Sequence, residues 1–327
     1  MGFPRLAMAS IAAMLVLGLP LSQGAFAEEG GSGHYLPGSM ASFMDAVPTT
    51  PTFILRYNQL YYSGSAGANK AIPIDGHAAL GLNATSWGEG ITLAWAPKLK
   101  MPKHWSYMMS TTIPFVQMDV SASAVVQAPS SGNMVGISRS SSLGSLGDMI
   151  IMPAMFNYNF SPNLNMNFRL AEYLPTGDYS TSRLANTGKN FTTTEPTAAI
   201  IYMGAKNGRE ASLFAGIDFN TKNSATQYQS GDQFHLDGTV AQHLPLLKGL
   251  AGIGLSSFYY QQVTGDSGSG ATFGQFKSTD AGIGPVVSYV KPFGKKQLLA
   301  EFKWLDEYYT ANRLQGSTVF FKAMFKF

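Results

Sequence analysis

The chain has no cysteine among its 327 residues, which excludes a small domain held together by disulfide bonds. Charged residues make up only 13% of the chain, against about 25% in a typical soluble domain. The net charge of +3 gives no basis for a nucleic-acid partner, because such proteins show a clustered basic face. Scarce charge combined with 12% aromatic residues favours a protein with much of its surface in lipid.

Long apolar runs are also missing beyond residue 27. None reaches the ~18 residues that a membrane-spanning helix needs, and residues 244–255, for example, are interrupted by Lys248. If the protein lies in a membrane, a closed β-barrel is the remaining architecture, because lipid cannot hydrogen-bond an open sheet edge.

The amino-terminal residues indicate export. Arg5 precedes an apolar run over residues 7–21, and Ala25-Phe26-Ala27 fits a small-x-small cleavage pattern. We therefore predict a signal peptide over residues 1–27; the alternative, an anchor helix, is disfavoured because the run is short. Residues 28–52 are rich in Gly, Ser and Pro and form either a periplasmic arm or a plug inserted in the lumen, and residues 53–327 form the barrel.

The carboxyl-terminal residues show the alternation of a strand with two different faces. Val319, Phe321, Ala323, Phe325 and Phe327 share one parity, and Phe320, Lys322, Met324 and Lys326 share the other. An apolar face opposite one with two ammonium groups fits an outer-membrane barrel strand between lipid and a wet lumen. A soluble sandwich would show the same alternation, so this strand alone does not decide.

Similar alternation recurs along the chain and predicts about twelve strands. Their expected ranges are 53–63, 75–97, 105–118, 148–160, 163–174, 194–204, 210–221, 233–244, 250–262, 280–290, 297–306 and 317–327. The second contains Gly88-Glu89-Gly90, where we expect a bulge or kink. On the strand over 148–160, we place Ile150 and Met152 on the same face as Phe156.

Connection length separates the barrel from the sandwich. Short connections alternate with long ones, and the long ones are expected near 64–74, 119–147, 175–193, 222–232, 263–279 and 307–316. Short periplasmic turns and long external loops are typical of bacterial barrels, whereas a sandwich has no reason to alternate so regularly. The sequence therefore predicts an all-β, transmembrane, antiparallel up-and-down β-barrel in the bacterial outer membrane.

The residues on the more polar face of these strands are the candidate pore-lining residues. They are Arg56, Asn58, Asn163, Asn165, Asn167, Arg169, Asp218, His235, Asp237, Glu301, Lys303, Lys322 and Lys326. They line a narrow conduit or form a salt-bridged filling of the interior, and both interpretations remain open. Aromatic residues on the same faces, such as Phe214 and Phe320, favour an amphipathic or aromatic solute over a small ion.

Motifs for catalysis or metal binding are weak. Asp232, His235 and Asp237 could supply metal ligands, but lumen-facing polar groups explain them better, and we expect neither metal nor cofactor. Gly265-Asp266-Ser267-Gly268 resembles a protease nucleophile loop without the remainder of such a site. An outer-membrane enzyme would need a dyad such as His243 with Ser256 or Ser257, which nothing marks, so we expect no enzyme.

Several segments nonetheless carry a resemblance to a known family. They are Gly33-His34-Tyr35-Leu36-Pro37-Gly38, Tyr173-Leu174-Pro175-Thr176-Gly177-Asp178-Tyr179, Asn186-Thr187-Gly188-Lys189-Asn190, Glu195-Pro196, Tyr228-Gln229-Ser230-Gly231-Asp232, Phe234-His235-Leu236-Asp237, Thr264-Gly265-Asp266-Ser267-Gly268, Gly284-Pro285, Lys303-Trp304, and Asn312-Arg313 with Gly316. In this order they resemble the outer-membrane proteins named for the phenol meta-degradation pathway. The resemblance implies an outer-membrane barrel that lets hydrophobic or aromatic compounds cross.

We therefore expect a passive outer-membrane channel for small apolar or aromatic solutes, with outer-membrane lipid as its surroundings. The first alternative is a barrel that conducts nothing and binds a partner through its long loops. An outer-membrane enzyme is the second alternative.

Overall fold

The computed structural model describes residues 31–327 except 75–76, 128–133, 273–274 and 276. The expected signal peptide, residues 1–27, lies outside the described residues, as do residues 28–30 of the segment that follows it. Among the described residues, no helix has the length and apolar character to span a membrane.

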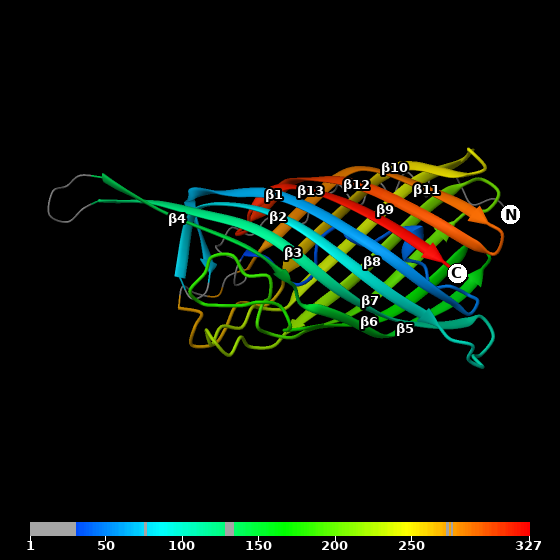
Figure 1. The fold of residues 1–327 in the computed structure, drawn as a ribbon, viewed down its shortest axis with the longest axis horizontal. Helices are drawn as coiled ribbons and strands as arrows, with labels where there is room; N and C mark the ends of the chain where they lie inside the picture. The colour runs from blue at the N-terminus through cyan, green and yellow to red at the C-terminus, as the bar shows by residue number, and fades with distance from the viewer. Residues whose placement is uncertain (1–30, 75–76, 128–133, 273–274, 276) are drawn as a thin grey trace.

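Antiparallel strands form a single closed sheet, in which the first strand, β1, pairs with the last strand, β13, and β2 pairs with β3 (Figure 1). The strands are β1 (Thr52–Ile74), β2 (His77–Ala96), β3 (Trp105–Gln127), β4 (Met134–Leu146), β5 (Met149–Ser161), β6 (Leu164–Leu174), β7 (Thr193–Met203), β8 (Arg209–Asn220), β9 (Gln233–Leu246), β10 (Gly249–Gln262), β11 (Thr279–Phe293), β12 (Lys296–Ala311) and β13 (Gln315–Lys326). The predicted all-β, antiparallel, closed barrel is confirmed.

The wall has twelve strand positions, as predicted, with one extra strand. Strands β4 and β5 both pair with β3. β5 pairs with its first part, Trp105–Thr112, and β4 pairs with its second part, Phe115–Gln127. Only Gly147 and Asp148 separate β4 from β5. The β3–β4 hairpin therefore continues past the point where β5 and β6 pair, and it projects from one end of the barrel (Figure 1).

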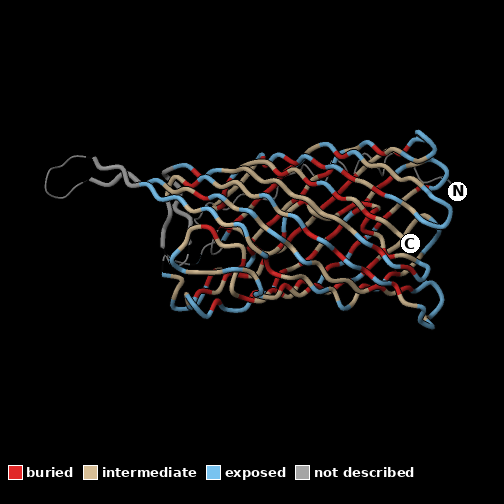
Figure 2. The backbone as a smooth tube through the Cα atoms, viewed as in Figure 1, coloured by how far each residue is buried: buried red, intermediate tan, exposed pale blue. Residues whose placement is uncertain are grey.

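Alternation along the strands sorts side chains between lumen and exterior (Figure 2). On β1, Phe53 is 61% exposed and Leu55 is 41% exposed, whereas Ile54 between them is 5% exposed. The tryptophans Trp87, Trp95 and Trp304 also lie among the large exposed apolar side chains. An exterior this apolar requires lipid around it, and the barrel is of the bacterial outer-membrane type.

The pairing register of the strands differs from two expectations about local strand geometry. Gly88, Glu89 and Gly90 pair without interruption on both sides, so the bulge expected there is absent. A register shift lies instead between Ile151 and Ala154 of β5. The shift reverses the parity, so Met152 packs against buried residues rather than sharing the outer face with Phe156.

Several expected long loops are extended strands. β1 reaches Ile74, β3 and β4 occupy most of residues 119–147, and β12 reaches Ala311. These residues are polar and small, which resembles loop composition, but antiparallel pairing satisfies their backbone groups. The long connections that remain between strands are 175–192, 221–232 and 263–278.

Residues 31–51, named here the lumen segment, run inside the barrel before β1 begins (Figure 1). They include η2 (Phe43–Asp45), a 3-10 turn. Ser42 caps it by accepting a hydrogen bond from the Met44 backbone N–H at 3.0 Å. Contacts with strands on several sides of the wall hold the lumen segment, and they form the candidate site.

Candidate functional site

Asp237 on β9 anchors the first half of the lumen segment. Its carboxylate accepts hydrogen bonds from the Tyr35 hydroxyl at 2.6 Å, the Gly38 N–H at 3.2 Å and the Met40 N–H at 3.0 Å. The Tyr35 ring stacks on His235 with ring centroids 3.5 Å apart. Burial, followed by the nearby carboxylate of Asp237, raises the pKa of Tyr35 well above its usual value, so its hydroxyl remains a donor.

Lys303 on β12 holds the same turn of the lumen segment from the opposite side. Its ammonium group donates to the carbonyl oxygens of Gly38 and Met40. Gly38 has φ +84°, and a Cβ there would lie 2.2 Å from Leu305 Cδ1. Close approach and left-handed backbone therefore both require glycine at this position.

We expect Gly38→Ala to lower the free energy of unfolding by about 2–4 kcal/mol, since left-handed strain adds to overpacking. Gly294→Ala is the matched control, because Gly294 has φ +61° and a Cβ added there would meet no atom within 4 Å. Strain alone should cost the control about 1–2 kcal/mol. Urea unfolding of both variants in detergent measures the difference, and equal losses would refute the close packing of Gly38.

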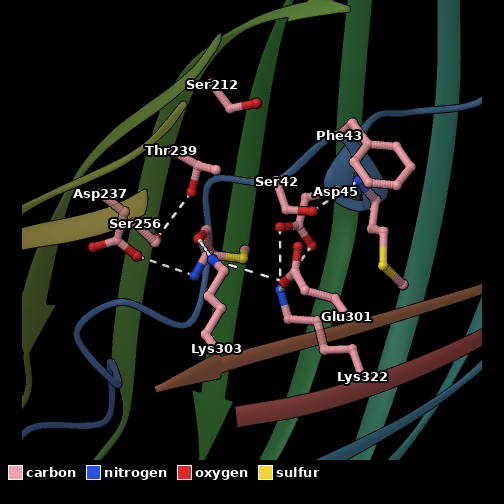
Figure 3. Close-up of polar contacts among 12 residues, drawn as sticks. Ser42, Phe43, Asp45, Ser212, Asp237, Thr239, Ser256, Glu301, Lys303 and Lys322 are labelled. Atoms are coloured by element: carbon pink, nitrogen blue, oxygen red, sulfur yellow. Dashed lines mark hydrogen bonds and ion pairs between the residues drawn. The ribbon is translucent and has the colours of Figure 1, made fainter. Parts of the chain in front are cut away.

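Asp45 anchors the second half of the lumen segment at the cationic part of the wall. Its carboxylate lies 3.2 Å from Lys322 Nζ (Figure 3). It also lies 3.1 Å from Arg56 Nη1, and Arg169 donates to the backbone carbonyl of Asp45. Burial acts to raise the pKa of Asp45, but attraction by Lys322, Arg56 and Arg169 outweighs it and lowers the pKa. Nearby, Glu210 on β8 accepts the Phe43 N–H at 2.7 Å.

Asp148, between β4 and β5, ties the start of the lumen segment to the 175–192 loop. It accepts hydrogen bonds from the Gly177 and Lys189 backbone N–H groups at 2.8 and 2.7 Å, and it pairs with His34 Nε2 at 2.9 Å. Burial acts to raise the pKa of Asp148, but the hydrogen bond from His34 and these backbone donors lower it.

This lowered pKa predicts acid loosening of the 175–192 loop. When folding lowers the pKa of a carboxyl group, that group stabilises the fold fully at pH values above its ordinary pKa of about 3.9. The stabilisation is lost as the pH falls through the pKa of the group in the folded state. We expect pepsin to cleave within residues 175–192 increasingly as pH falls below about 4. Asp148→Asn should be cleaved equally across this range, and a wild-type loop with no pH dependence would contradict the assignment.

The candidate pore-lining residues separate into groups by their contacts. Those that contact the lumen segment are Arg56, Arg169, His235, Asp237, Lys303 and Lys322. Those that contact neighbouring wall side chains are Asn58, Asn167, Asp218 and Glu301. Asn163 lies in the β5–β6 turn, Asn165 at the start of β6 and Lys326 at the end of β13. Their role as pore lining stays a prediction.

Glu195, Glu210 and Asp148 are among the buried acids that sequence reasoning missed. Glu195 on β7 and Glu210 on β8 share the inner parity of their strands with buried threonine or serine, so the alternation that identified Asp218 could have identified them. Asp148 lies outside any alternating pattern. Its partners are mainly backbone groups of a distant loop, which no local signal encodes.

An apolar cavity lies on the loop side of the lumen segment. Its empty space, mouth included, is about 1160 Å³. Leu36 and Pro37 of the lumen segment line it together with wall and loop residues, among them Leu60, Leu82, Met118, Val120, Phe191 and Phe320. Polar groups at its margin include Glu307 and Arg313. A mainly apolar cavity with a few polar groups suits a small amphipathic solute.

The pair considered for an enzyme does not form a dyad. His243 Nε2 lies 2.7 Å from Glu210 Oε2, while the Ser256 hydroxyl accepts a hydrogen bond from Thr239 at 2.9 Å. In the register, His243 faces Gly252 and Ser256 faces Thr239, so four residues of strand separate them. Among the described residues, the partners of the Ser256 hydroxyl are Thr239 and the Gly238 carbonyl, and neither is a general base.

Comparison with known proteins supports this description. The family model described as "Putative MetA-pathway of phenol degradation" matches residues 66–323. A search of curated proteins gave no match. Among solved structures, the COG4313 outer membrane channel from Pseudomonas putida F1 is similar at 17% identity and TM-score 0.62, over 86% of this chain and 97% of that one. At this identity the likeness shows a shared fold.

Two further solved structures are similar at lower TM-scores. The β domain of the Bordetella autotransporter BrkA has 11% identity and TM-score 0.43, over 85% of this chain and 99% of its own. A Pseudomonas aeruginosa FadL homologue has 10% identity and TM-score 0.38, over 85% of this chain and 89% of its own.

Proposed function

Because the chain belongs to the family described as "Putative MetA-pathway of phenol degradation", we propose that it is a passive outer-membrane channel for small apolar or aromatic solutes. The observation that carries the proposal is the apolar cavity between the external loops and the lumen segment. A solute of this class gains roughly 25 cal/mol for each Å² of apolar surface that it removes from water there.

The lumen segment is the proposed plug of this channel. Leu36 and Pro37 form part of the cavity wall, so a solute held there lies directly against the lumen segment. Passage to the periplasmic side requires the lumen segment to move or to leave a path along its edge. Its polar contacts with Asp237, Lys303 and Lys322 fix the resting position.

Polar groups beside the cavity would orient a solute that carries one hydroxyl. Glu307 accepts a hydrogen bond from Tyr62 at 3.4 Å, and Arg313 lies 4.3 Å from the centre of the Tyr260 ring. A carboxylate beside apolar walls offers an acceptor to a phenolic hydroxyl while the ring contacts Leu82 and Phe320. Diffusion down a gradient supplies the driving force, and the mechanism requires no bond to break.

Flux into proteoliposomes tests the proposal. Purified protein should speed entry of phenol over protein-free liposomes, and it should give little entry of a monosaccharide of similar size. Equal acceleration of both probes would indicate a general porin. Acceleration of neither would overturn the proposed transport.

The alternative of a non-conducting barrel has one observation in its favour. The lumen segment contacts strands around the whole wall, from β1 to β13, so the resting lumen is substantially filled. In that case the external loops would bind a partner, and release of the lumen segment would serve no purpose. Solute flux through the intact protein, with the lumen segment in place, separates the two hypotheses.

A further inference from the structure

Three ionisable side chains from adjacent strands converge in the wall behind Tyr35. They are Glu195 on β7, Asp218 on β8 and His235 on β9, and they are 1%, 0% and 0% exposed. One potential ligand atom from each lies within 4.8 Å of the others. His235 Nε2 is 3.4 Å from Glu195 Oε1 and 3.7 Å from Asp218 Oδ1.

These separations are close to those around a small metal ion. Zn²⁺ binds imidazole nitrogen and carboxylate oxygen at about 2.0–2.2 Å in tetrahedral geometry, which places ligand atoms about 3.3–3.6 Å apart. Imidazole with two carboxylates suits first-row ions such as Zn²⁺ or Mn²⁺ better than Mg²⁺, which retains water and prefers oxygen ligands.

The His235 ring is available to bind a ligand and is fixed in position. Neither of its nitrogens has a hydrogen-bond partner among the described residues. Tyr35 covers one face of the ring, and Gly216 leaves space for its edge, since a Cβ there would lie 2.4 Å from Nε2. A buried imidazole nitrogen without a hydrogen bond is costly, and a metal ion at Nε2 would remove the cost for that nitrogen.

Neighbouring groups support the same interpretation. The Glu195 carboxylate accepts hydrogen bonds from Tyr173 at 2.6 Å and Thr197 at 2.8 Å, which orient it as outer-shell partners orient metal ligands. Gln233, opposite Asp218 in the register, is 0% exposed and has no hydrogen bond to the described residues at either side-chain amide atom. It offers a further oxygen donor on the inner face of β9.

We propose that Glu195, Asp218 and His235 form a binding site for one divalent first-row transition-metal ion. The ion would join three wall strands directly behind the stacked ring of Tyr35 and so stiffen the surface that holds the lumen segment. This site revises the sequence-based expectation of no metal. It also differs from the set considered there, because Asp237 binds the lumen segment and Asp232 precedes β9. The inference does not depend on the transport proposal.

Metal titration of the full-length mature protein tests the site. Protein in detergent is treated with EDTA, loaded with Zn²⁺, separated by gel filtration and analysed for bound zinc. We expect one equivalent in the wild type, little in His235→Asn and an unchanged amount in His243→Asn. His243 is the matched control, because it is a similarly buried histidine paired with one carboxylate only among the described residues.

Two further readouts separate ligation from general stability. Co²⁺ loading should give the visible absorption of a low-symmetry site in the wild type and not in His235→Asn. Zn²⁺, but not Mg²⁺, should raise the melting temperature of the wild type. If His235→Asn fails to fold, Asp218→Asn carries the same comparison. Wild-type protein free of zinc after loading, or zinc retained by folded His235→Asn, would overturn the site.

Discussion

Deletion of residues 31–49 should raise single-channel conductance in planar bilayers by roughly tenfold or more, since a twelve-strand barrel encloses more space than its own wall side chains fill. The expected change is large because the lumen segment contributes the groups that occupy the middle of the lumen. Its removal leaves Asp237, Glu210, Lys303 and Lys322 in contact with water. These groups then line a hydrated path.

A point substitution tests the same idea without shortening the chain. Asp45→Lys places a cation against Lys322, Arg56 and Arg169, so like-charge repulsion should displace the lumen segment and increase open events. Asp306→Lys makes the same change of charge on the outer face of β12 and should leave conductance unchanged. Bilayers that stay silent with both the deletion and Asp45→Lys would favour the non-conducting barrel.

Met118→Arg should reduce phenol flux into proteoliposomes by roughly tenfold or more, because apolar contacts of the Met or Leu kind contribute about 1.5–3 kcal/mol each. Met118 lies on β3 and lines the cavity. An arginine there fills part of the cavity and requires a dry apolar wall to accept a charge, which disfavours an aromatic solute.

The neighbouring residue supplies the control. Gln117 is exposed on the opposite face of the same strand, so Gln117→Arg adds the same side chain outside the cavity. Phenol flux should be unchanged in that variant. Equal losses in the two variants would indicate a general effect on β3 and would contradict a binding role for the cavity.

The barrel could be predicted from the sequence because the alternation of side chains between its two faces is a local property of each strand. Phe53, Ile54 and Leu55 show how two-residue periodicity assigns each side chain to lipid or lumen without knowledge of its neighbours. Strand ends were harder to predict, since residues 134–146 are rich in Ser and Gly and acquire strand structure from pairing with β3. The shift between Ile151 and Ala154 likewise depends on β6 and leaves no local signal.

The site was predictable only in part. Parity placed Asp237, Lys303 and Lys322 on the inner strand faces, but it did not identify their partners. Their partners in the lumen segment are backbone groups, the Tyr35 hydroxyl and the Asp45 carboxylate, and the lumen segment has no periodicity of its own. The convergence of Glu195, Asp218 and His235 depends on the register between three strands, which a single sequence does not reveal.

The two cations that pair with the Asp45 carboxylate belong to the first and last strands of the barrel. Arg56 lies on β1 and Lys322 on β13, and these strands pair directly. Asp45 therefore bridges the seam at which the sheet closes, and it can make both contacts only after the ends of the chain have met. Insertion of the lumen segment is thus a late event in assembly. If β1 and β13 do not pair, Asp45 cannot lie between Arg56 and Lys322 as their common counter-ion. The lumen segment therefore blocks the pore only when the wall of the barrel is complete.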